Sequence, residues 1–395
     1  MSSQKTVLVY RNELLPVSET FIKEQVLALR QWRPVLVGRQ LLEQLPLDNL
    51  DVRIVGPQNS TLPTKLSWKF RRALGLIPTR AINELTAENP LLVHAHFGID
   101  ALDAWPIARA LKLPMLVTFH GYDINIYREW WESGNAGLRM RFYPRRLLRL
   151  ARNPHVRFVA VSEAIRRRAI EFGIPGEKIF VCYIGIDSTK FSPGPVPISK
   201  RPPCVLFVGR LVEKKGCSYL IEAMAEVQQT VQGARLIVVG DGPLRANLEQ
   251  FAQANRVNVT FRGSLSSEDV KRELDAARLL CLPSITAHNG DAEGLPISIL
   301  EAQASGTPVV TSARGGVGEA VKDGETGLVF AERDSRQLAA QLLKILTSDH
   351  LADRISVTSV AMIASCFNQR GQLTGQLESL YDEISRAHQR SATTK

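Results

Sequence analysis

The amino-acid sequence predicts an α/β protein composed of two doubly wound domains. Its length of 395 residues is more than one ordinary hydrophobic core accommodates, which suggests two domains of roughly 150–200 residues each. Each half alternates short apolar runs, typical of buried strands, with longer stretches typical of helices, which is the pattern of a parallel sheet covered by helices. With 45% hydrophobic residues, the chain can bury two cores.

The elements follow one another in the same manner in both halves. In the first half, helix-like stretches such as 21–31 separate strands predicted over residues 6–10, 34–37, 52–55, 91–94, 115–118 and 157–161. In the second half, helical segments including 218–231 separate strands predicted over residues 204–208, 234–239, 259–262, 279–282 and 308–311.

A proline-rich segment over residues 191–203 lies between the halves. Because proline cannot continue a central strand or a helix, we interpret this segment as the linker and expect domains over 1–197 and 198–370. Ligands of open α/β sheets sit beyond the carboxyl ends of the strands, so two such domains facing each other would form a cleft. Residues 390–395 have the composition of a frayed tail.

Several protein classes are disfavoured by the composition. The chain has no run of about 18 apolar residues and its N-terminus lacks the apolar core of a signal peptide, so we expect a cytoplasmic, unexported protein. The cysteines lack CxxC spacing, which disfavours disulfides and zinc and favours buried free thiols. They are Cys182, Cys204, Cys217, Cys281 and Cys366.

The net charge of +10 belongs entirely to the first half: residues 1–196 hold 27 Lys and Arg against 17 Asp and Glu, and residues 197–395 hold 22 of each. Part of the excess is concentrated in residues 139–152, just after Trp130 and Trp131. Interleaved basic and apolar residues could lay this segment on an anionic membrane surface. A solvated helix face is the alternative, and nucleic acid is disfavoured because no recognised nucleic-acid module accompanies the segment.

Two carboxylates stand eight positions apart in the second half. Glu293 precedes a Gly-Leu-Pro turn, and Glu301 lies in an apolar run that we expect to be helical from Pro296 to a stop at Gly306. A helix N-terminus presents unpaired N–H groups that favour a diphosphate, and a carboxylate further along can accept hydrogen bonds from ribose hydroxyls. The spacing suits a sugar nucleotide, and a buried strand-turn-helix with two solvated carboxylates is the alternative.

Two cations, Arg210 and Lys215, stand on the loop directly after the predicted strand 204–208. Guanidinium and ammonium groups at that place can bind diphosphate oxygens and stabilise the charge on a departing nucleoside diphosphate, although a solvated turn has the same composition. The next strand ends at Gly240-Asp241-Gly242, but Arg245 stands where a dinucleotide fingerprint has its third glycine. That motif favours a tight turn over a nicotinamide site.

Histidines mark two strand ends in the first half. His120 follows the strand 115–118 and precedes a glycine, so it could hydrogen-bond a sugar hydroxyl, although a lone histidine is more often structural. His94 and His96, two positions apart on one strand, lack a clear third metal ligand and indicate a polar scaffold or an acceptor contact. Asp-x-Asp is absent, so we infer a metal-independent site in which Arg210 and Lys215 take the electrostatic role of a metal.

Taken together, these motifs resemble the family 4 retaining glycosyltransferases of GT-B fold, over nearly the whole chain. The narrower resemblance is to the bacterial exopolysaccharide branch, similar to the colanic acid and amylovoran galactosyltransferases. The segments that carry the family resemblance are 120–121, 185–187, 191–193, 209–216, 240–243, 293–301 and 306–310. The narrower resemblance rests on segments 96–98, 119–123 and 283–294.

The resemblance implies a fold, a reaction and roles for individual residues. The fold is two Rossmann-like domains facing across a cleft, with residues 371–395 forming a helix that crosses back to the first domain and a tail. Arg210 and Lys215 would contact the donor diphosphate, and Glu301 the ribose. Sugar and phosphate contacts would come from Glu293 and the amides of Gly294 and Leu295, and from His120 of the opposite domain.

The implied reaction is retaining transfer of a hexose, with no protein nucleophile, metal or cofactor. The leaving phosphate of a nucleoside-diphosphate sugar, with UDP-galactose or UDP-glucose favoured, would take the acceptor's proton. The acceptor would be a lipid-linked saccharide, with the enzyme peripheral on the inner face of the cytoplasmic membrane. Alternatives are a transferase that acts on a soluble glycan and a non-catalytic sugar-nucleotide-binding GT-B module. One departure from the family is that residues 16–21 lack the usual glycine pair, which puts the N-terminal backbone contact to the donor phosphate in doubt.

Overall fold

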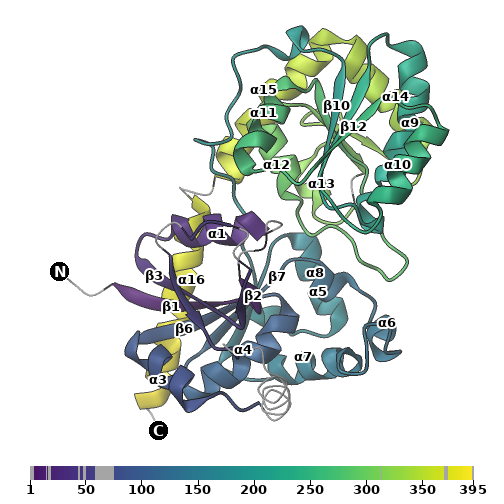
Figure 1. Cartoon of the computed structure of the whole chain (residues 1–395). Helices are drawn as coiled ribbons and strands as arrows, with labels where there is room; N and C mark the ends of the chain where they lie inside the picture. Colours follow the sequence, from purple (N-terminus) through teal and green to yellow (C-terminus); the bar gives the residue numbers. More distant parts are fainter. Residues whose placement is uncertain are drawn as a thin grey trace. The chain divides into compact units, whose positions relative to one another are not determined.

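The computed structural model of the chain describes residues 4–14, 16, 19–42, 45–47, 50–57, 75–312, 314–368 and 372–393 (Figure 1). The chain divides into two compact units, unit 1 (Met1–Tyr183 with Gly371–Lys395) and unit 2 (Ile184–Arg370). Each unit is built on one parallel sheet with helices packed against it, which confirms the predicted α/β class.

The sheet of unit 1 has seven strands in the order β5-β3-β1-β6-β7-β8-β9, all parallel. Their apolar runs are buried because helices cover both faces of such a sheet. The strands are β1 (Lys5–Tyr10), β3 (Trp32–Gly38), β5 (Asp51–Ile54), β6 (Pro90–His96), β7 (Met115–Phe119), β8 (Val156–Ala160) and β9 (Ile179–Val181). The short strands β2 (Glu13–Leu14) and β4 (Gln40–Leu41) pair with each other.

The helices of unit 1 begin and end where local signals place them. In α8 (Glu163–Phe172), the Ser162 hydroxyl accepts a hydrogen bond from the Ile165 N–H at 3.2 Å, and Gly173 ends the helix in the left-handed region. The other helices are α1 (Thr20–Ala28), α3 (Thr79–Ala87), α4 (Gly98–Ala110), α5 (Tyr122–Asn125), α6 (Arg128–Glu132) and α7 (Tyr143–Ala151), with 3₁₀ turns η2 (Met140–Phe142) and η3 (Gly176–Lys178).

The C-terminal helix α16 (Thr374–Thr393) belongs to unit 1 and lies beside its first strands, where the yellow helix crosses the purple ribbon in Figure 1. Its buried side chains join the core formed by β1, β3 and β6, and each contributes about 1.5–3 kcal/mol by burial. These side chains are Leu377, Leu380, Tyr381 and Ile384. The expectation of a frayed tail from residue 390 is wrong, because the helix continues to Thr393, and residues 394 and 395 lie outside the described part of the chain.

The sheet of unit 2 has six parallel strands in the order β12-β11-β10-β13-β14-β15. They are β10 (Cys204–Val208), β11 (Arg235–Val239), β12 (Val259–Gly263), β13 (Leu279–Leu282), β14 (Val309–Ser312) and β15 (Leu328–Phe330). The helices are α9 (Cys217–Thr230), α10 (Arg245–Ala254), α11 (Ser267–Ala276), α12 (Ile297–Ala304), α13 (Val317–Ala320), α14 (Ser335–Thr347) and α15 (Asp349–Cys366), with 3₁₀ turns η4 (Ile198–Lys200) and η5 (Glu213–Lys215).

The division between the units falls at Tyr183 and Ile184, earlier than the predicted boundary near residue 198. The proline-rich segment is docked on unit 2, because the buried Arg201 guanidinium donates to the carbonyls of Leu274 and Ala277 at 2.8 and 3.2 Å. Prolines stop regular structure but do not prevent a segment from packing, which is why composition alone misplaced the boundary.

The composition predicted buried free cysteines and no long apolar run. Four of the five cysteines are buried free thiols, as predicted, whereas Cys366 at the end of α15 is exposed. No helix in the described part of the chain combines the length and apolar character needed to cross a bilayer.

Both sheets reverse their winding beside a central strand. In unit 1 the reversal lies between β1 and β6, and in unit 2 between β10 and β13. Loops that follow such a pair of strands diverge to opposite faces and leave a crevice at the carboxyl edge, where ligands of these folds bind. Ligand-binding residues are therefore expected directly after β1, β6, β10 and β13.

We expect Glu378→Ala to destabilise unit 1 by about 3 kcal/mol. The buried Glu378 carboxylate of α16 accepts the backbone N–H groups of Arg30, Gln31 and Trp32 at 2.8, 2.6 and 3.1 Å, and its removal leaves these donors without their acceptor. Urea unfolding followed by tryptophan fluorescence measures this unit selectively, because all five tryptophans lie in its sequence.

Two matched variants control this experiment. Glu378→Gln keeps an acceptor oxygen and should lose less stability, and Glu383→Ala removes an exposed carboxylate of the same helix, with an expected effect within about 0.5 kcal/mol. Equal losses for Glu378→Ala and Glu383→Ala would show that α16 is not anchored through Glu378.

Candidate active site

The central feature of unit 2 is a buried ion pair at the reversal of its sheet. The Lys215 ammonium lies 2.7 Å from a Glu293 carboxylate oxygen, which also accepts a hydrogen bond from the Ser284 hydroxyl at 3.0 Å. Lys215 comes from the loop after β10, and Ser284 from the loop after β13. Two residues that the sequence analysis singled out independently are therefore in direct contact.

The two loops fit together because glycine stands where they meet. Gly216, between η5 and α9, has φ of +63°, and a Cβ there would lie 1.9 Å from the Pro283 carbonyl oxygen. The Ile285 N–H donates to the Lys214 carbonyl at 2.8 Å, so the backbones are joined directly. This close approach positions Lys215 against Glu293.

The charge of Glu293 is balanced within the site. Burial alone would raise the pKa of Glu293, but Lys215, Lys214 and the Ser284 hydroxyl outweigh burial and hold this pKa below its ordinary value of 4.5. A second pair, Lys214 with Asp291 at 3.1 Å, lies alongside on the same two loops. Glu293 is therefore a carboxylate at neutral pH.

Arg210, the other predicted cation, is exposed at the start of the same loop. Its guanidinium makes no hydrogen bond or ion pair with any described residue, so it remains available for a ligand. The loop contacts the Gly240-Asp241-Gly242 turn, where the Leu211 N–H donates a hydrogen bond to the Asp241 carbonyl at 2.9 Å. The motif forms a turn between β11 and α10, as the sequence predicted.

The predicted helix after the Gly-Leu-Pro turn is α12, and Glu301 is its fifth residue, half-buried. Pro296 immediately precedes the helix instead of occupying its first position, and Gly306, with φ of +70°, follows its end. Gly294 and Leu295 are buried between Glu293 and this helix. The donor-side candidates thus lie on two adjoining segments of unit 2.

His120 is the corresponding candidate in unit 1, directly after β7. Its Nε2 lies 3.0 Å from Nδ1 of His96, and the rings of Phe21 and Phe97 lie against it with centroid distances of 5.0 and 4.5 Å. Its Nδ1 is buried and has no hydrogen-bond partner among the described residues. Burial lowers the pKa values of His96 and His120 well below the ordinary value, so both rings are neutral.

His94 has a structural place in the core. Its ring nitrogens lie 2.7 Å from the Tyr381 hydroxyl of α16 and 2.7 Å from the Thr118 hydroxyl of β7, and burial lowers its pKa to about 3. This agrees with the scaffold interpretation. No group of three metal-ligating side chains gathers anywhere in the described parts of the chain.

Sequence reasoning missed the polar cluster at the reversal of the first sheet. Arg11, directly after β1, pairs with Glu19 at 2.6 Å and with the buried Asp100 of α4, and stacks over the Phe97 ring at 4.4 Å. Asp100 also accepts from the Asn12 backbone N–H at 2.7 Å. Burial raises the pKa of Asp100 even though Arg11 and Asn12 act in the opposite direction.

One member of this cluster, Glu19, comes from residues 16–21, the segment that lacks the glycine pair expected from the family resemblance. Val17 and Ser18 of that loop lie outside the described residues, whereas Glu19 is held by Arg11. The sequence does show Arg11 and Asn12 at the end of the first strand and Asp100 in the first turn of α4. Their contacts in the structure are what show that they form one cluster.

Asp123 supports the loop that carries His120. Its carboxylate accepts the backbone N–H groups of Gly98, His120 and Gly121 at 2.8, 3.1 and 3.0 Å. Burial raises the pKa of Asp123 to about 6, although these three donors act in the opposite direction. The carboxylate therefore connects the ends of β6 and β7.

Both halves of the chain match families of known glycosyltransferases. Residues 188–359 match the glycosyl transferases group 1 family, and residues 25–190 match glycosyltransferase family 4. A protein named as the colanic acid biosynthesis glycosyltransferase WcaL of Salmonella typhimurium is 32% identical over 73% of this chain and 70% of its own length. The amylovoran biosynthesis glycosyltransferase AmsK of Erwinia amylovora is 32% identical over 72% and 67%.

Solved structures agree on the fold. HepE of Anabaena, crystallised with UDP and glucose, has a TM-score of 0.76 and 19% identity, covering 96% of this chain and 100% of that one. Sucrose-phosphate synthase of Thermosynechococcus elongatus has a TM-score of 0.78 and 19% identity, with 97% and 100% covered. The fold is GT-B. The chain belongs to the family 4 glycosyltransferases and is related to the enzymes of exopolysaccharide biosynthesis.

We expect Lys215→Met to reverse the pH dependence that Glu293 gives to unit 2. The lowered pKa of Glu293 stabilises the wild-type fold fully above the ordinary pKa of 4.5, and this contribution is lost as the pH falls through the folded-state pKa. Without the ammonium, burial raises the pKa of Glu293, so the variant loses stability as the pH rises. The deficit should reach about 3 kcal/mol at neutral pH and narrow toward about pH 4.

Scanning calorimetry of the unit 2 transition across this pH range makes the measurement. Lys200→Met, which removes an exposed lysine of the same unit, is the matched control and should show no such trend. A deficit that is constant with pH would mean that Lys215 does not set the ionisation of Glu293.

Proposed function

We propose that this glycosyltransferase moves a hexose from a nucleoside-diphosphate sugar, UDP-galactose or UDP-glucose, to a lipid-linked saccharide acceptor. The observation that carries the proposal is the Lys215–Glu293 pair at the reversal of the unit 2 sheet, with the unpaired Arg210 on the same loop. Cations at this edge suit a diphosphate, and a carboxylate among them suits the hydroxyls of the attached sugar.

Donor binding divides among residues of unit 2. Arg210 and Lys215 contact the diphosphate, the amides of Gly294 and Leu295 contact phosphate and sugar, and Glu301 accepts hydrogen bonds from the ribose. The structure of HepE in complex with UDP-glucose, a protein of the same fold, supports a uridine nucleotide as the first donor to test.

The reaction we infer retains the anomeric configuration and uses no metal. Glu293 is already engaged by Lys215 and Ser284, which supports orientation of the sugar and stabilisation of an oxocarbenium-like transition state over nucleophilic attack. The leaving phosphate, held by Arg210 and Lys215, takes the acceptor's proton. The neutral ring of His120 in unit 1 contributes a hydrogen bond to the sugar.

A lipid-linked acceptor calls for a protein that works at a surface. The basic stretch 139–152 and its approach carry exposed apolar side chains, with Leu138 at 81% and Phe142 at 52% exposure, beside exposed arginines of α7. This combination supports peripheral binding to the anionic inner face of the cytoplasmic membrane. The relatives named for colanic acid and amylovoran biosynthesis support an exopolysaccharide as the product to which the transfer contributes.

Two alternative functions would give different experimental results from the proposed one. A transferase acting on a soluble glycan would bind no anionic vesicles, and a non-catalytic GT-B module would bind sugar nucleotides without turnover. The paired charges of Lys215 and Glu293 and the unpaired Arg210 favour a working donor site over the second of these.

We expect UDP to bind the wild-type chain and Glu301→Ala to weaken it by at least about tenfold, because a ribose hydroxyl loses a charged acceptor worth roughly 1.5–3 kcal/mol. Isothermal calorimetry with UDP, GDP, ADP and NAD makes the test. Tight binding of a different nucleoside diphosphate would replace uridine in the proposal, and binding of NAD alone would refute the donor assignment.

Lys215→Ala should lose on the order of 2–4 kcal/mol of transition-state stabilisation, roughly 30- to 1000-fold in kcat, because a preorganised charge next to the leaving group is removed. Hydrolysis of the donor sugar by folded protein gives the rate, and Lys200→Ala is the control for a lysine lost elsewhere in unit 2. Unchanged turnover would remove Lys215 from the proposed mechanism.

A further inference from the structure

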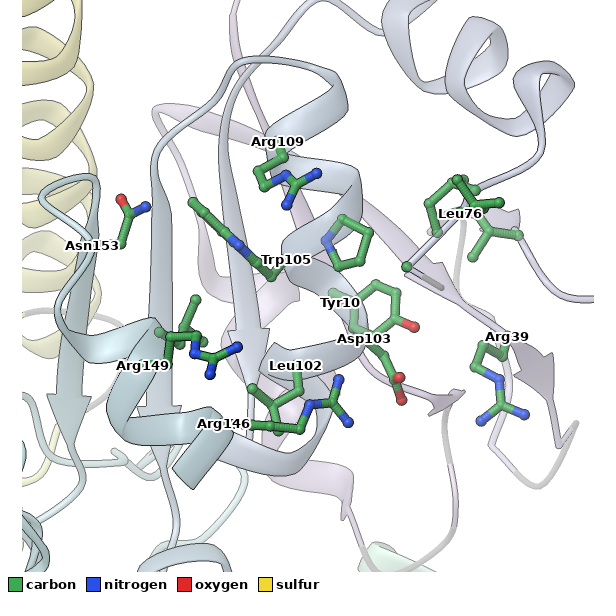
Figure 2. A pocket seen from close by; sticks show the side chains of 15 residues that line it. Tyr10, Arg39, Leu76, Leu102, Asp103, Trp105, Arg109, Arg146, Arg149 and Asn153 are labelled. Atoms are coloured by element: carbon green, nitrogen blue, oxygen red, sulfur yellow. The ribbon is translucent and has the colours of Figure 1, made fainter. Parts of the chain in front are cut away.

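Unit 1 contains a cavity of about 450 Å³ that the donor site does not use. Its walls come from α4, from α7, from the ends of β1 and β3, and from residues 75–77 (Figure 2). Cavities of this size hold small organic ligands.

Four arginines line the cavity: Arg39 after β3, Arg109 of α4, and Arg146 and Arg149 of α7. None of their guanidinium groups makes a hydrogen bond or ion pair with any residue that the structure describes, and the Nε of Arg39 is buried without an acceptor. Figure 2 shows Arg146 and Arg149 extending from α7 toward the side chains of α4. Arg109, Arg146 and Arg149 are exposed, so their guanidinium groups can exchange bound water for the oxygens of an anionic ligand in this space.

The carboxylate in the lining does not supply that anion. Asp103 of α4 pairs with Arg139 at 2.8 Å and accepts from the Asn12 side-chain amide at 3.0 Å. Asn12 also donates to Asp100 at 2.6 Å, and Asp100 pairs with Arg11. The cavity therefore keeps its positive charge and adjoins the polar cluster at the reversal of the first sheet.

Apolar side chains form another part of the lining, beside the polar Tyr10 and Asn153. Trp105 and Pro106 of α4 and Leu76 form part of the wall, and Leu76 is 52% exposed. Guanidinium groups beside an aromatic and aliphatic wall suit a ligand with a phosphate at one end and hydrocarbon at the other.

We propose that this cavity binds a phosphate or diphosphate group, with two possible sources: the headgroup of a lipid, or a soluble phosphate compound. The planar fork of arginine binds phosphate oxygens in pairs, and the four arginines provide enough donors for a diphosphate. The lipid source rests on the proposed lipid-linked acceptor, whose diphosphate would lie beside the acceptor-side residues of unit 1.

The test is calorimetric binding of geranyl diphosphate and of inorganic diphosphate to the full chain with its donor site saturated by UDP. In Arg109→Gln/Arg149→Gln, binding should weaken at least tenfold, because two charged contacts are lost. The matched control is Arg141→Gln/Arg152→Gln, which removes the same charge from exposed positions flanking α7 outside the cavity and should bind as the wild type does. Both pairs are exposed, so folding is preserved in each.

The two probes separate the sources. A lipid headgroup is assigned if geranyl diphosphate binds at least tenfold more tightly than inorganic diphosphate and Trp105→Ala abolishes that difference. A soluble phosphate compound is assigned if the two probes bind equally. Equal weakening by the pocket and control variants would overturn the cavity site in favour of diffuse charge, and no binding of either probe would overturn it outright.

The outcome is independent of the donor proposal. Failure of every nucleoside diphosphate to bind refutes the donor site and leaves the cavity to be measured with the two diphosphates alone. Binding of UDP with no effect of the cavity arginines refutes only the cavity.

Discussion

Parallel pairing of one central strand with neighbours that wind in opposite directions is the constraint on which both units depend. In unit 1 the strand is β1, between β3 and β6, and in unit 2 it is β10, between β11 and β13. Since helices leave these neighbours toward opposite faces, the loops beyond the central strand are free to carry polar side chains. Arg11 and Lys215, which organise the two polar clusters, stand on these loops.

The buried carboxylates near these loops are neutralised in different ways. Glu293 faces a lysine and a hydroxyl, and its pKa is lowered; Asp100 faces Arg11 but burial prevails and raises its pKa. Asp123 has backbone N–H donors and no cation among its hydrogen-bond partners in the described part of the chain, and its pKa rises to about 6. Two lysines and a hydroxyl donor act on Glu293 and outweigh its burial, whereas Asp100 shares Arg11 with Glu19 and lies near Asp103. Glu293 is thereby suited to a polar, permanently charged role.

The positive charge of the first half is distributed by the fold over two kinds of place. Some arginines form ion pairs within unit 1, such as Arg11 with Asp100 and Arg139 with Asp103. Others remain unpaired on the described surface, and those of α4 and α7 converge on one cavity. The composition gives only the net charge of the first half. The tertiary structure is needed to tell whether the arginines are spread over a surface or gathered around one cavity.

The sequence by itself determined the α/β class, the family, and the described strands other than β2, β4, β9 and β15, because strand periodicity and glycine-cation motifs are local and need no three-dimensional information. It also selected Lys215 and Glu293, although nothing in their spacing required contact. Only the tertiary structure decided that contact, the place of the proline-rich segment within unit 2, and the cluster of Arg11, Asn12 and Asp100. The physical reason is that an ion pair, a docked coil or a cavity depends on residues brought together from distant strands, and burial then sets their charges.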